Sequence, residues 1–328
     1  MNDLPPSDLQ RREDARFQQD VEQLIDSAER TRLHHMKVQR SRNLLSLFSG
    51  IVTVIAGAAG FGWFFLMQGQ LMFGIAAMAA GIAPLILMKF WAAQPVKAYI
   101  RSHKTEFMPQ MADLLGGLKF YPARGISRKI VSKTGVIPPH EIYKAEDCFM
   151  GKYKNVKVIF SEARLYKTKR DKEPVFDGIF VLLEIGDKMI EGHTILTADG
   201  ALAKRAAPTL WRKFTPVNIQ TANPSWNRFQ IFSTKPESAE LLVGEKFLKE
   251  LAEAAEIFND APLSAALFAG KYIFIAIPYE EDMFEASNMH VPVTTKRHAL
   301  QCKKEIEQLL EIIDVFDVYK AQVPGSVS

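Results

Sequence analysis

The residues of this chain best suited to acid–base catalysis are four carboxylates that follow an apolar stretch. Glu280, Glu281, Asp282 and Glu285 cluster in PYEEDMFEASNMH, and catalytic acids often occupy loops at the ends of strands. Two carboxylates held close together could act as general acid and general base. The same composition is typical of the acidic first turn of a short surface helix. We favour this second interpretation, because the spacing selects no catalytic pair.

Four more acids lie in or beside segments with strand-like alternation: Glu162, Asp177, Glu184 and Glu191. Any one of them could line a cleft, but their spacing selects no two that would act together. An enzyme of unrecognised type that uses acids such as Glu162 or Glu280 therefore stays open as an alternative.

The histidines and cysteines are too scattered to indicate a metal site. His34 and His35 are adjacent, so on a helix they point about 100° apart and cannot chelate together. Cys148 and Cys302 form no C-x-x-C pair and fit a reduced compartment. The sequence has no glycine-rich phosphate loop and no G-x-S-x-G elbow. It therefore predicts no catalytic residue, no metal and no cofactor.

The element that dominates the sequence is a long apolar run, since no charged residue occurs between Arg42 and Lys89. One helix of that length would span about 69 Å, more than twice a hydrocarbon core of ~30 Å. The break at Gln68-Gly69-Gln70 divides the run into residues 44–67 and 71–88. We predict a transmembrane helical hairpin over residues 44–91, with a buried hairpin in a soluble core as the alternative.

Basic residues flank both ends of this run, beginning with a stretch from Arg30 to Arg42 that contains no acid. The bases nearest the predicted hairpin are Arg40, Arg42, Lys89, Lys97 and Arg101. The positive-inside rule then places both termini in the cytoplasm. These side chains could also attract anionic lipid headgroups, or serve only as topology signals.

Small residues recur in both apolar segments, among them Gly57, Gly60, Gly62, Gly74 and Gly81. Such residues let helix backbones approach closely in lipid. The simplest interpretation is that the two helices pack on each other; homo-oligomerisation or a membrane partner is the alternative. No ionisable residue lies within the run, so no ion path is indicated, and we interpret the hairpin as an anchor.

The flanking segments are predicted to be helical. Residues 1–43 contain an amphipathic helix with a narrow apolar stripe at Phe17, Val21, Leu24 and Ala28. After the hairpin, Pro95 is predicted to begin a helix that Gly116-Gly117 ends. His103 lies on the apolar face of that helix and is interpreted as a packed residue.

Residues 92–328 are predicted to form one cytoplasmic globular domain of the α+β class, with a mixed, mainly antiparallel sheet packed with helices. We expect strands at 153–168 and 227–233, two strands joined at Gly186-Asp187 within 177–196, a hairpin at 263–278 that turns at Gly270-Lys271, and helices at 236–258 and 296–317. Apolar side chains at 272–277 face both ways, so that strand should be central. The helix at 236–258 should bury a stripe that includes Leu241, and Cys302 should be a core residue of the last helix.

The charge distribution gives no case for nucleic acid. The net charge is only +4, and the two basic clusters, at 119–133 and 164–172, lack an aromatic-studded strand or a recognition helix. We interpret both clusters as solvated loops, with a membrane-facing surface as the alternative.

Several motifs in the globular region resemble a bacterial family known as domain of unknown function 3137. They are GKYKNVKVIFSEARLYK, FDGIFVLLEI, GHTIL, FQIFSTKPESAELL and SAALFAGKYIFIAIPYEEDMFEA, in this order after the hairpin, and the resemblance covers roughly residues 149–315. It implies a bacterial inner-membrane protein with a cytoplasmic globular domain, and it supplies no reaction and no site residues.

Together these features predict a cytoplasmic binding or scaffold domain, anchored in the inner membrane, whose partners are the lipid bilayer and a protein. A homo-oligomeric membrane organiser and an enzyme of unrecognised type are the alternatives.

Overall fold

The computed structural model describes residues 8–153, 156–185, 190–198, 212–219, 228–280, 284 and 289–290. The chain divides into two compact units. We call residues 1–107 with 285–300 the hairpin unit, and residues 108–284 with 301–328 the sheet unit.

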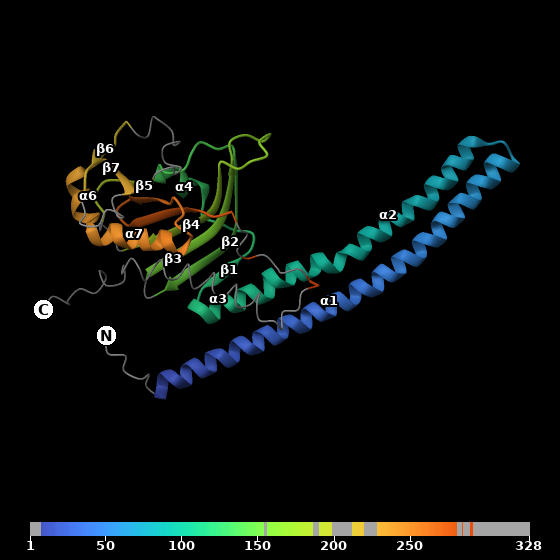
Figure 1. The fold of residues 1–328 in the computed structure, drawn as a ribbon, viewed down its shortest axis with the longest axis horizontal. Coiled ribbons are helices and arrows are strands. Elements are labelled where there is room, and N and C mark those ends of the chain that lie inside the picture. Colours follow the sequence, from blue (N-terminus) through green and yellow to red (C-terminus); the bar gives the residue numbers. More distant parts are fainter. Residues whose placement is uncertain are drawn as a thin grey trace. The chain divides into compact units, whose positions relative to one another are not determined.

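The hairpin unit is built from two long antiparallel helices that lie side by side (Figure 1). Helix α1 spans Asp8–Gly62 and continues as a π-helical turn, η1, at Trp63–Met67. Helix α2 spans Leu71–Ser102 and is followed by a second π-helical turn, η2, at His103–Phe107. The chain reverses at Gln68-Gly69-Gln70, where Gly69 has a φ of 65° that glycine tolerates without strain. The reversal therefore lies where the sequence predicted it.

The prediction that a new helix begins at Pro95 is wrong, because α2 runs through both Pro84 and Pro95 without a break. Pro95 is buried inside this helix. Helix α1 likewise continues through residue 43, so the apolar run has no helix boundary at either of its outer ends. A change of side-chain polarity, rather than a change of secondary structure, separates the apolar part from the polar part.

The sheet unit begins with helix α3 (Met108–Gly116), which ends where Gly117 adopts a φ of 60°. Its described strands and further helices follow in this order: β1 (Lys119–Tyr121), α4 (Arg128–Thr134), β2 (Ile142–Tyr153), β3 (Val156–Tyr166), β4 (Phe176–Glu184), β5 (Thr194–Ala198), β6 (Thr215–Val217), β7 (Phe229–Ser233), α6 (Pro236–Leu242), α7 (Glu245–Ile257), β8 (Ser264–Phe268) and β9 (Tyr272–Pro278).

These strands form one nine-stranded sheet in the order β1-β2-β3-β4-β9-β8-β5-β7-β6. Every described pair is antiparallel, so the α+β class is confirmed and no parallel pair mixes into the described sheet. Strand β9 lies in the middle and is buried on both faces, as its two-sided apolar sequence predicted. One face of the sheet packs against α4 and forms an apolar core cluster with it. Val131 of α4, Phe180 of β4 and Phe274 of β9 are buried in this cluster.

Several predicted details of the sheet unit are wrong. The two strands expected within 177–196 are not neighbours, because β8 and β9 lie between β4 and β5. The tight turn of the β8–β9 hairpin has positive φ at Ala269 and Gly270, one residue earlier than expected. The Lys271 N–H donates to the Phe268 carbonyl at 3.3 Å and closes this turn, and positive φ at both central residues is typical of a tight hairpin turn.

The helix expected over 236–258 is two helices, because Val243-Gly244 separates α6 from α7. Leu241, expected in the buried stripe, is 87% exposed, whereas Leu248 and Leu251 are buried. Strand β2, Ile142–Tyr153, precedes the strand expected at 153–168 and was not itself predicted. The turn at Gly186-Asp187, the helix at 296–317 and Cys302 lie outside the described residues.

Candidate functional site

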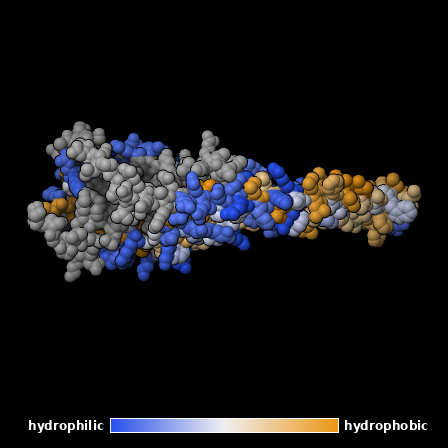
Figure 2. Space-filling model, turned by 90° about the horizontal axis from the view of Figure 1, so that it is seen from below, coloured by the Kyte–Doolittle hydropathy of each residue, from blue (hydrophilic) through white to orange (hydrophobic). Residues whose placement is uncertain are grey.

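The exposed apolar side chains of the described structure are concentrated on the helical hairpin. Among the residues whose burial is described, every exposed large hydrophobic residue lies between Leu44 and Trp91, except for Leu33, Ile100 and Leu241. Figure 2 shows this apolar surface around the part of the hairpin near its turn. Two helices are therefore long and apolar enough to cross a membrane. Water would strongly disfavour so large a continuous apolar surface.

Four of the five predicted glycines lie where α1 and α2 are in close contact. A Cβ added to Gly81 would lie 2.7 Å from the Thr53 carbonyl oxygen and 2.9 Å from the Cα of Gly57. A Cβ on Gly60 would meet the Ala77 side chain at 3.0 Å, and one on Gly74 would meet Phe61 at 3.1 Å. The space around Gly62, by contrast, is open. Gly57 and Gly81 therefore allow the two helices of one chain to pack closely against each other.

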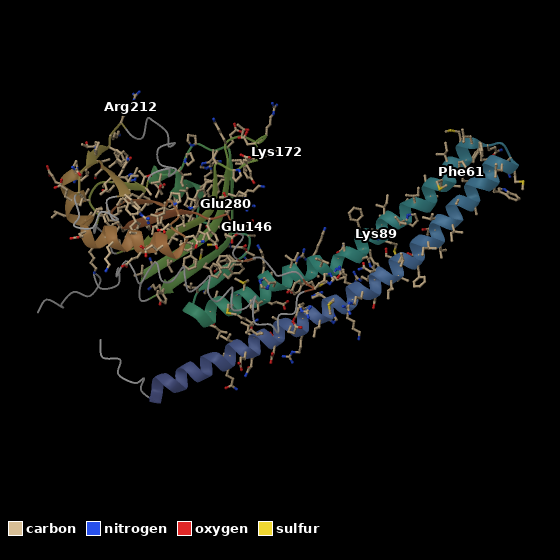
Figure 3. All side chains as sticks on the ribbon, viewed as in Figure 1. Phe61, Lys89, Glu146, Lys172, Arg212 and Glu280 are labelled. Carbon is tan, nitrogen blue, oxygen red and sulfur yellow. The ribbon has the colours of Figure 1, made fainter. Side chains whose placement is uncertain are left out.

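The predicted flanking bases are exposed, with one exception. Arg40, Lys89, Lys97 and Arg101 are exposed on α1 and α2 (Lys89 is labelled in Figure 3). The Arg42 guanidinium instead lies over the ring of Trp91, 4.5 Å from its centroid, and donates to the Trp91 carbonyl at 3.3 Å. This contact links the two helices where the apolar run begins and ends.

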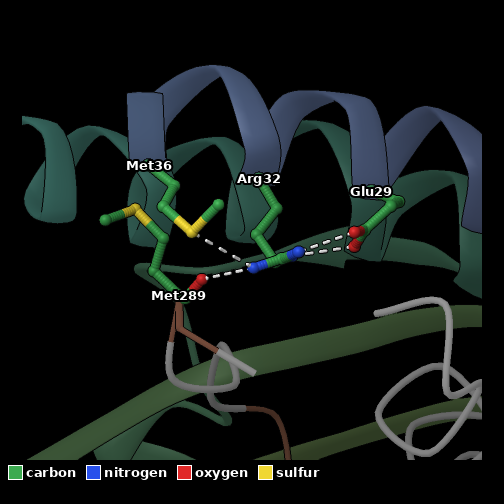
Figure 4. Close-up of polar contacts among 4 residues, drawn as sticks. All are labelled: Glu29, Arg32, Met36 and Met289. Atoms are coloured by element: carbon green, nitrogen blue, oxygen red, sulfur yellow. Dashed lines mark hydrogen bonds and ion pairs between the residues drawn. The ribbon is translucent and has the colours of Figure 1, made fainter. Parts of the chain in front are cut away.

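A buried polar cluster in the hairpin unit was not predicted (Figure 4). Arg32 is 3% exposed and makes a two-pronged contact with the Glu29 carboxylate, at 2.6 and 2.8 Å. It also donates to the Met289 carbonyl at 2.7 Å. The hydrogen bond to Glu29 raises the pKa of Arg32, so the guanidinium stays charged. Arg32 is therefore part of the internal packing, and it is not one of the exposed flanking bases.

The candidate acids are held by basic or backbone groups. Asp177 pairs with Arg164 at 2.6 Å and Glu191 with Lys235 at 3.2 Å. Glu162 accepts a hydrogen bond from the Phe284 N–H at 3.3 Å. Glu280 is exposed (Figure 3), and Glu281, Asp282 and Glu285 lie outside the described residues. Glu162 lies opposite another carboxylate, Glu146, in the register of β2 and β3.

The thiol and imidazole groups lie mainly in packed surroundings. Burial raises the pKa of Cys148 to about 11, and its neighbour Arg124 opposes the shift only in part. His103 is buried and stacks on Phe107 with ring centroids 4.9 Å apart, in agreement with its predicted packing role. Among the described residues, no three His, Cys, Asp or Glu side chains gather as metal ligands.

A pocket of about 480 Å³ opens on the face of the sheet that also carries α4. Its apolar floor comes from one row of register partners, Met150 on β2, Ile159 on β3 and Leu182 on β4. Ile130 of α4 and the rings of Tyr121 and Tyr272 complete the apolar lining. The volume is within the range of ~300–1,000 Å³ that is usual for ligand pockets.

Charged side chains lie along the rim of this pocket. Glu184 accepts from Lys271 at 2.7 Å and from Lys157 at 3.2 Å. The hydrogen bond from Lys271, followed by the contacts with Lys157, holds the pKa of Glu184 below its usual value, against the opposing effect of burial. Lys119 and Lys157 also line the pocket, so cationic groups outnumber the single carboxylate.

The pocket was not predicted from the sequence, although Glu184 was among the acids considered. The alternation of residues 153–168 places Lys157 and Ile159 on one face of β3, and this pattern was the available signal. The register with β2 and β4, which assembles the row, could not be derived from one strand alone.

The sequence and the fold were compared with known proteins. Residues 174–318 match the sequence profile of a family described as "Protein of unknown function (DUF3137)". No curated protein matches the chain significantly. Among solved structures, the chain is similar to "crystal structure of the mycobacterial trehalose monomycolate transport factor A, TtfA", with a TM-score of 0.35 and 11% identity, covering 66% of this chain and 96% of that one.

The family match confirms the resemblance indicated by the motifs, although it begins at residue 174 rather than near 149 and so leaves β2 and β3 outside the matched region. Within residues 174–318, the chain is thus similar in sequence to the family of unknown function DUF3137.

Proposed function

We propose that this chain is an inner-membrane protein whose helical hairpin anchors a cytoplasmic binding domain. The observation that carries the proposal is the concentration of exposed apolar side chains between Leu44 and Trp91. Lipid would solvate these side chains, and the hairpin buries the backbone polar groups in helical hydrogen bonds, as a bilayer requires.

The flanking bases support the orientation. Arg40, Lys89, Lys97 and Arg101 are exposed at the same end of the antiparallel helix pair, opposite the uncharged turn at 68–70. The positive-inside rule favours an arrangement with this end in the cytoplasm and the turn on the far side. Both termini would then be cytoplasmic.

Extraction of membranes from cells that express the full chain tests the anchor. We expect the chain to stay in the pellet at high salt and at alkaline pH, and to be released only by detergent. Release by salt or alkali would mean peripheral attachment and would overturn the proposal.

The role of the sheet unit in this proposal is to bind a partner protein. Leu241 of α6 is the large hydrophobic side chain that is most exposed among the described residues, at 87%. Although one exposed leucine is ordinary on a protein surface, its position provides a probe of this face. A photocrosslinking amino acid at Leu241 should give a discrete adduct in cells, while the same amino acid at exposed Lys249 of α7 serves as the control. If neither position gives an adduct, the proposal that the sheet unit binds a partner protein loses its support.

Homo-oligomerisation through the glycine face is the weaker candidate. Gly57 and Gly81 contact each other inside the hairpin, and this leaves them unavailable to a second copy.

A further inference from the structure

We propose that the pocket lined by α4 and strands β1–β4 and β9 binds an amphiphile made of an aliphatic chain with an anionic head group. This inference deepens the proposed function, and it rests on that function in one respect, namely that membrane anchoring keeps such molecules within reach. It assigns to the sheet unit a ligand of defined chemistry in addition to any protein partner.

The lining accounts for the aliphatic part of the ligand. Met150, Ile159 and Ile130 are only half-buried, although they lie beside a core whose central residues are fully buried. A ligand that covered these side chains would remove apolar surface from water, which stabilises a complex. The turn at Gly117–Leu118 lies close to Gly151, since a Cβ added to Gly151 would lie 3.0 Å from the Leu118 side chain. Gly117 and Gly151 both line the pocket, so this turn forms one of its walls.

The rim accounts for the anionic head. Lys152 and Lys157 are direct register partners on β2 and β3, so two like charges face each other on the same side of the sheet. Glu184, the next residue in this row, accepts from Lys271 at 2.7 Å and from Lys157 at 3.2 Å, so one carboxylate serves two ammonium groups and the Lys152–Lys157 pair keeps an excess positive charge. Such a like-charge pair is destabilising by itself, and an anion between the two ammonium groups would convert it into a favourable contact.

The arrangement selects an amphiphile rather than a free inorganic anion. The row of Lys152, Lys157 and Glu184 lies two residues along the strands from the row of Met150, Ile159 and Leu182. Cationic and apolar groups are therefore adjacent on one surface, so a single molecule with a polar end and an apolar end satisfies both. A small anion would leave the apolar row in water.

The test measures binding to the full chain in nanodiscs of phosphatidylcholine, which has no net charge, so that neither detergent nor an anionic amphiphile competes; protein-free nanodiscs serve as the blank. The probe is dansyl-undecanoate, whose emission increases and shifts to the blue in an apolar site. We expect saturable binding of one probe per chain. Laurate should displace the probe at least about tenfold more effectively than dodecanol, which has the same chain length without the charge.

Two variants localise the site. Lys157→Ala removes a rim charge and leaves Glu184 paired with Lys271, and it should weaken probe binding by about two- to fivefold. Lys172→Ala is the matched control, because Lys172 is exposed between β3 and β4 and does not line the pocket (Figure 3); it should bind like the parent chain. Met150→Trp fills the half-buried floor and should abolish saturable binding, with circular dichroism to confirm that the variant folds.

The competitors separate the possible sources and occupants. Displacement by laurate alone supports a free fatty acid, and equal displacement by lysophosphatidylglycerol supports a membrane phospholipid; either result supports the proposal. Displacement by dodecanol as effective as by laurate, or unchanged binding by Met150→Trp, would overturn it. Displacement only by an acidic amphipathic peptide would also overturn it, in favour of a protein ligand. None of these outcomes depends on the membrane topology, so a failure here is distinct from a failure of the anchor.

Discussion

The close approach of the two hairpin helices can be tested by adding one methyl group at each of two glycines. Gly81→Ala places a Cβ 2.7 Å from the Thr53 carbonyl oxygen, whereas Gly62→Ala places a Cβ in open space. Both glycines lie in helices, and Gly62 has helical angles of φ −57° and ψ −44°. The two substitutions are therefore matched in chemistry and differ in the packing around the added atom.

The magnitude follows from this geometry. Ordinary contacts begin at 3.4 Å, so the backbones at Gly81 must separate by about 0.7 Å. The atoms in contact are backbone atoms of Thr53 and Gly57, which cannot rotate away as a side chain could. Overpacking of this kind costs about 1–3 kcal/mol. The gain of about 1 kcal/mol in helix propensity on replacing Gly by Ala applies to both variants and cancels in their difference.

The assay is unfolding of the full chain in detergent micelles with increasing SDS, followed by tryptophan fluorescence, since Trp63 and Trp91 lie in the hairpin. We expect Gly81→Ala to unfold more readily than Gly62→Ala by about 1–3 kcal/mol. Unfolding free energies that agree within about 0.5 kcal/mol would refute the close approach of α1 and α2 at this position.

Three further predictions concern buried polar groups. Arg32→Leu should destabilise the chain by about 3–5 kcal/mol because it removes the two-pronged contact with the buried Glu29 carboxylate, while Glu29→Leu/Arg32→Leu should cost less; additive effects of the single changes in thermal unfolding would contradict this coupling. In a Cys302→Ser background, Cys148 should react with iodoacetamide at neutral pH at least about 100-fold more slowly in the folded chain than in urea, because burial raises its pKa to about 11. Labelling at equal rates would disprove its burial. Burial also lowers the pKa of His193, although the contact of its ring with the Thr134 carbonyl at 2.8 Å opposes the shift. The unfolded chain then takes up a proton that the folded chain does not, so stability should fall as the pH drops below about 6.5. His193→Gln should flatten that decline in unfolding experiments, and an unchanged slope would rule out His193 as its cause.

The features that could be predicted from the sequence are those set by local composition. The uncharged run between Arg42 and Lys89 indicated the two helices, and the Gln68-Gly69-Gln70 break placed their turn. The two-sided apolar pattern of 272–277 indicated a central strand, because a strand covered on both faces carries no alternation.

Features that depend on register or on distant partners could not be predicted. Arg32 lies in the basic, acid-free stretch before the hairpin, and its burial could not be predicted because it depends on a carbonyl at Met289 that is 257 residues away. The pocket requires the alignment of Met150, Ile159 and Leu182 across three strands, and no single strand encodes that register. The break between α6 and α7 at Gly244 was masked by amphipathic periodicity that continues on both sides of it.

The topology of the hairpin tests the central claim most directly. In a Cys148→Ser/Cys302→Ser background, Gln68→Cys places a thiol at the turn, and Lys37→Cys places one on the exposed surface of α1 before the apolar run. A membrane-impermeant maleimide applied to intact spheroplasts should label Gln68→Cys, and it should label Lys37→Cys only after lysis. Labelling of Lys37→Cys in intact spheroplasts, or recovery of the chain in the soluble fraction, would contradict an anchor with both termini in the cytoplasm.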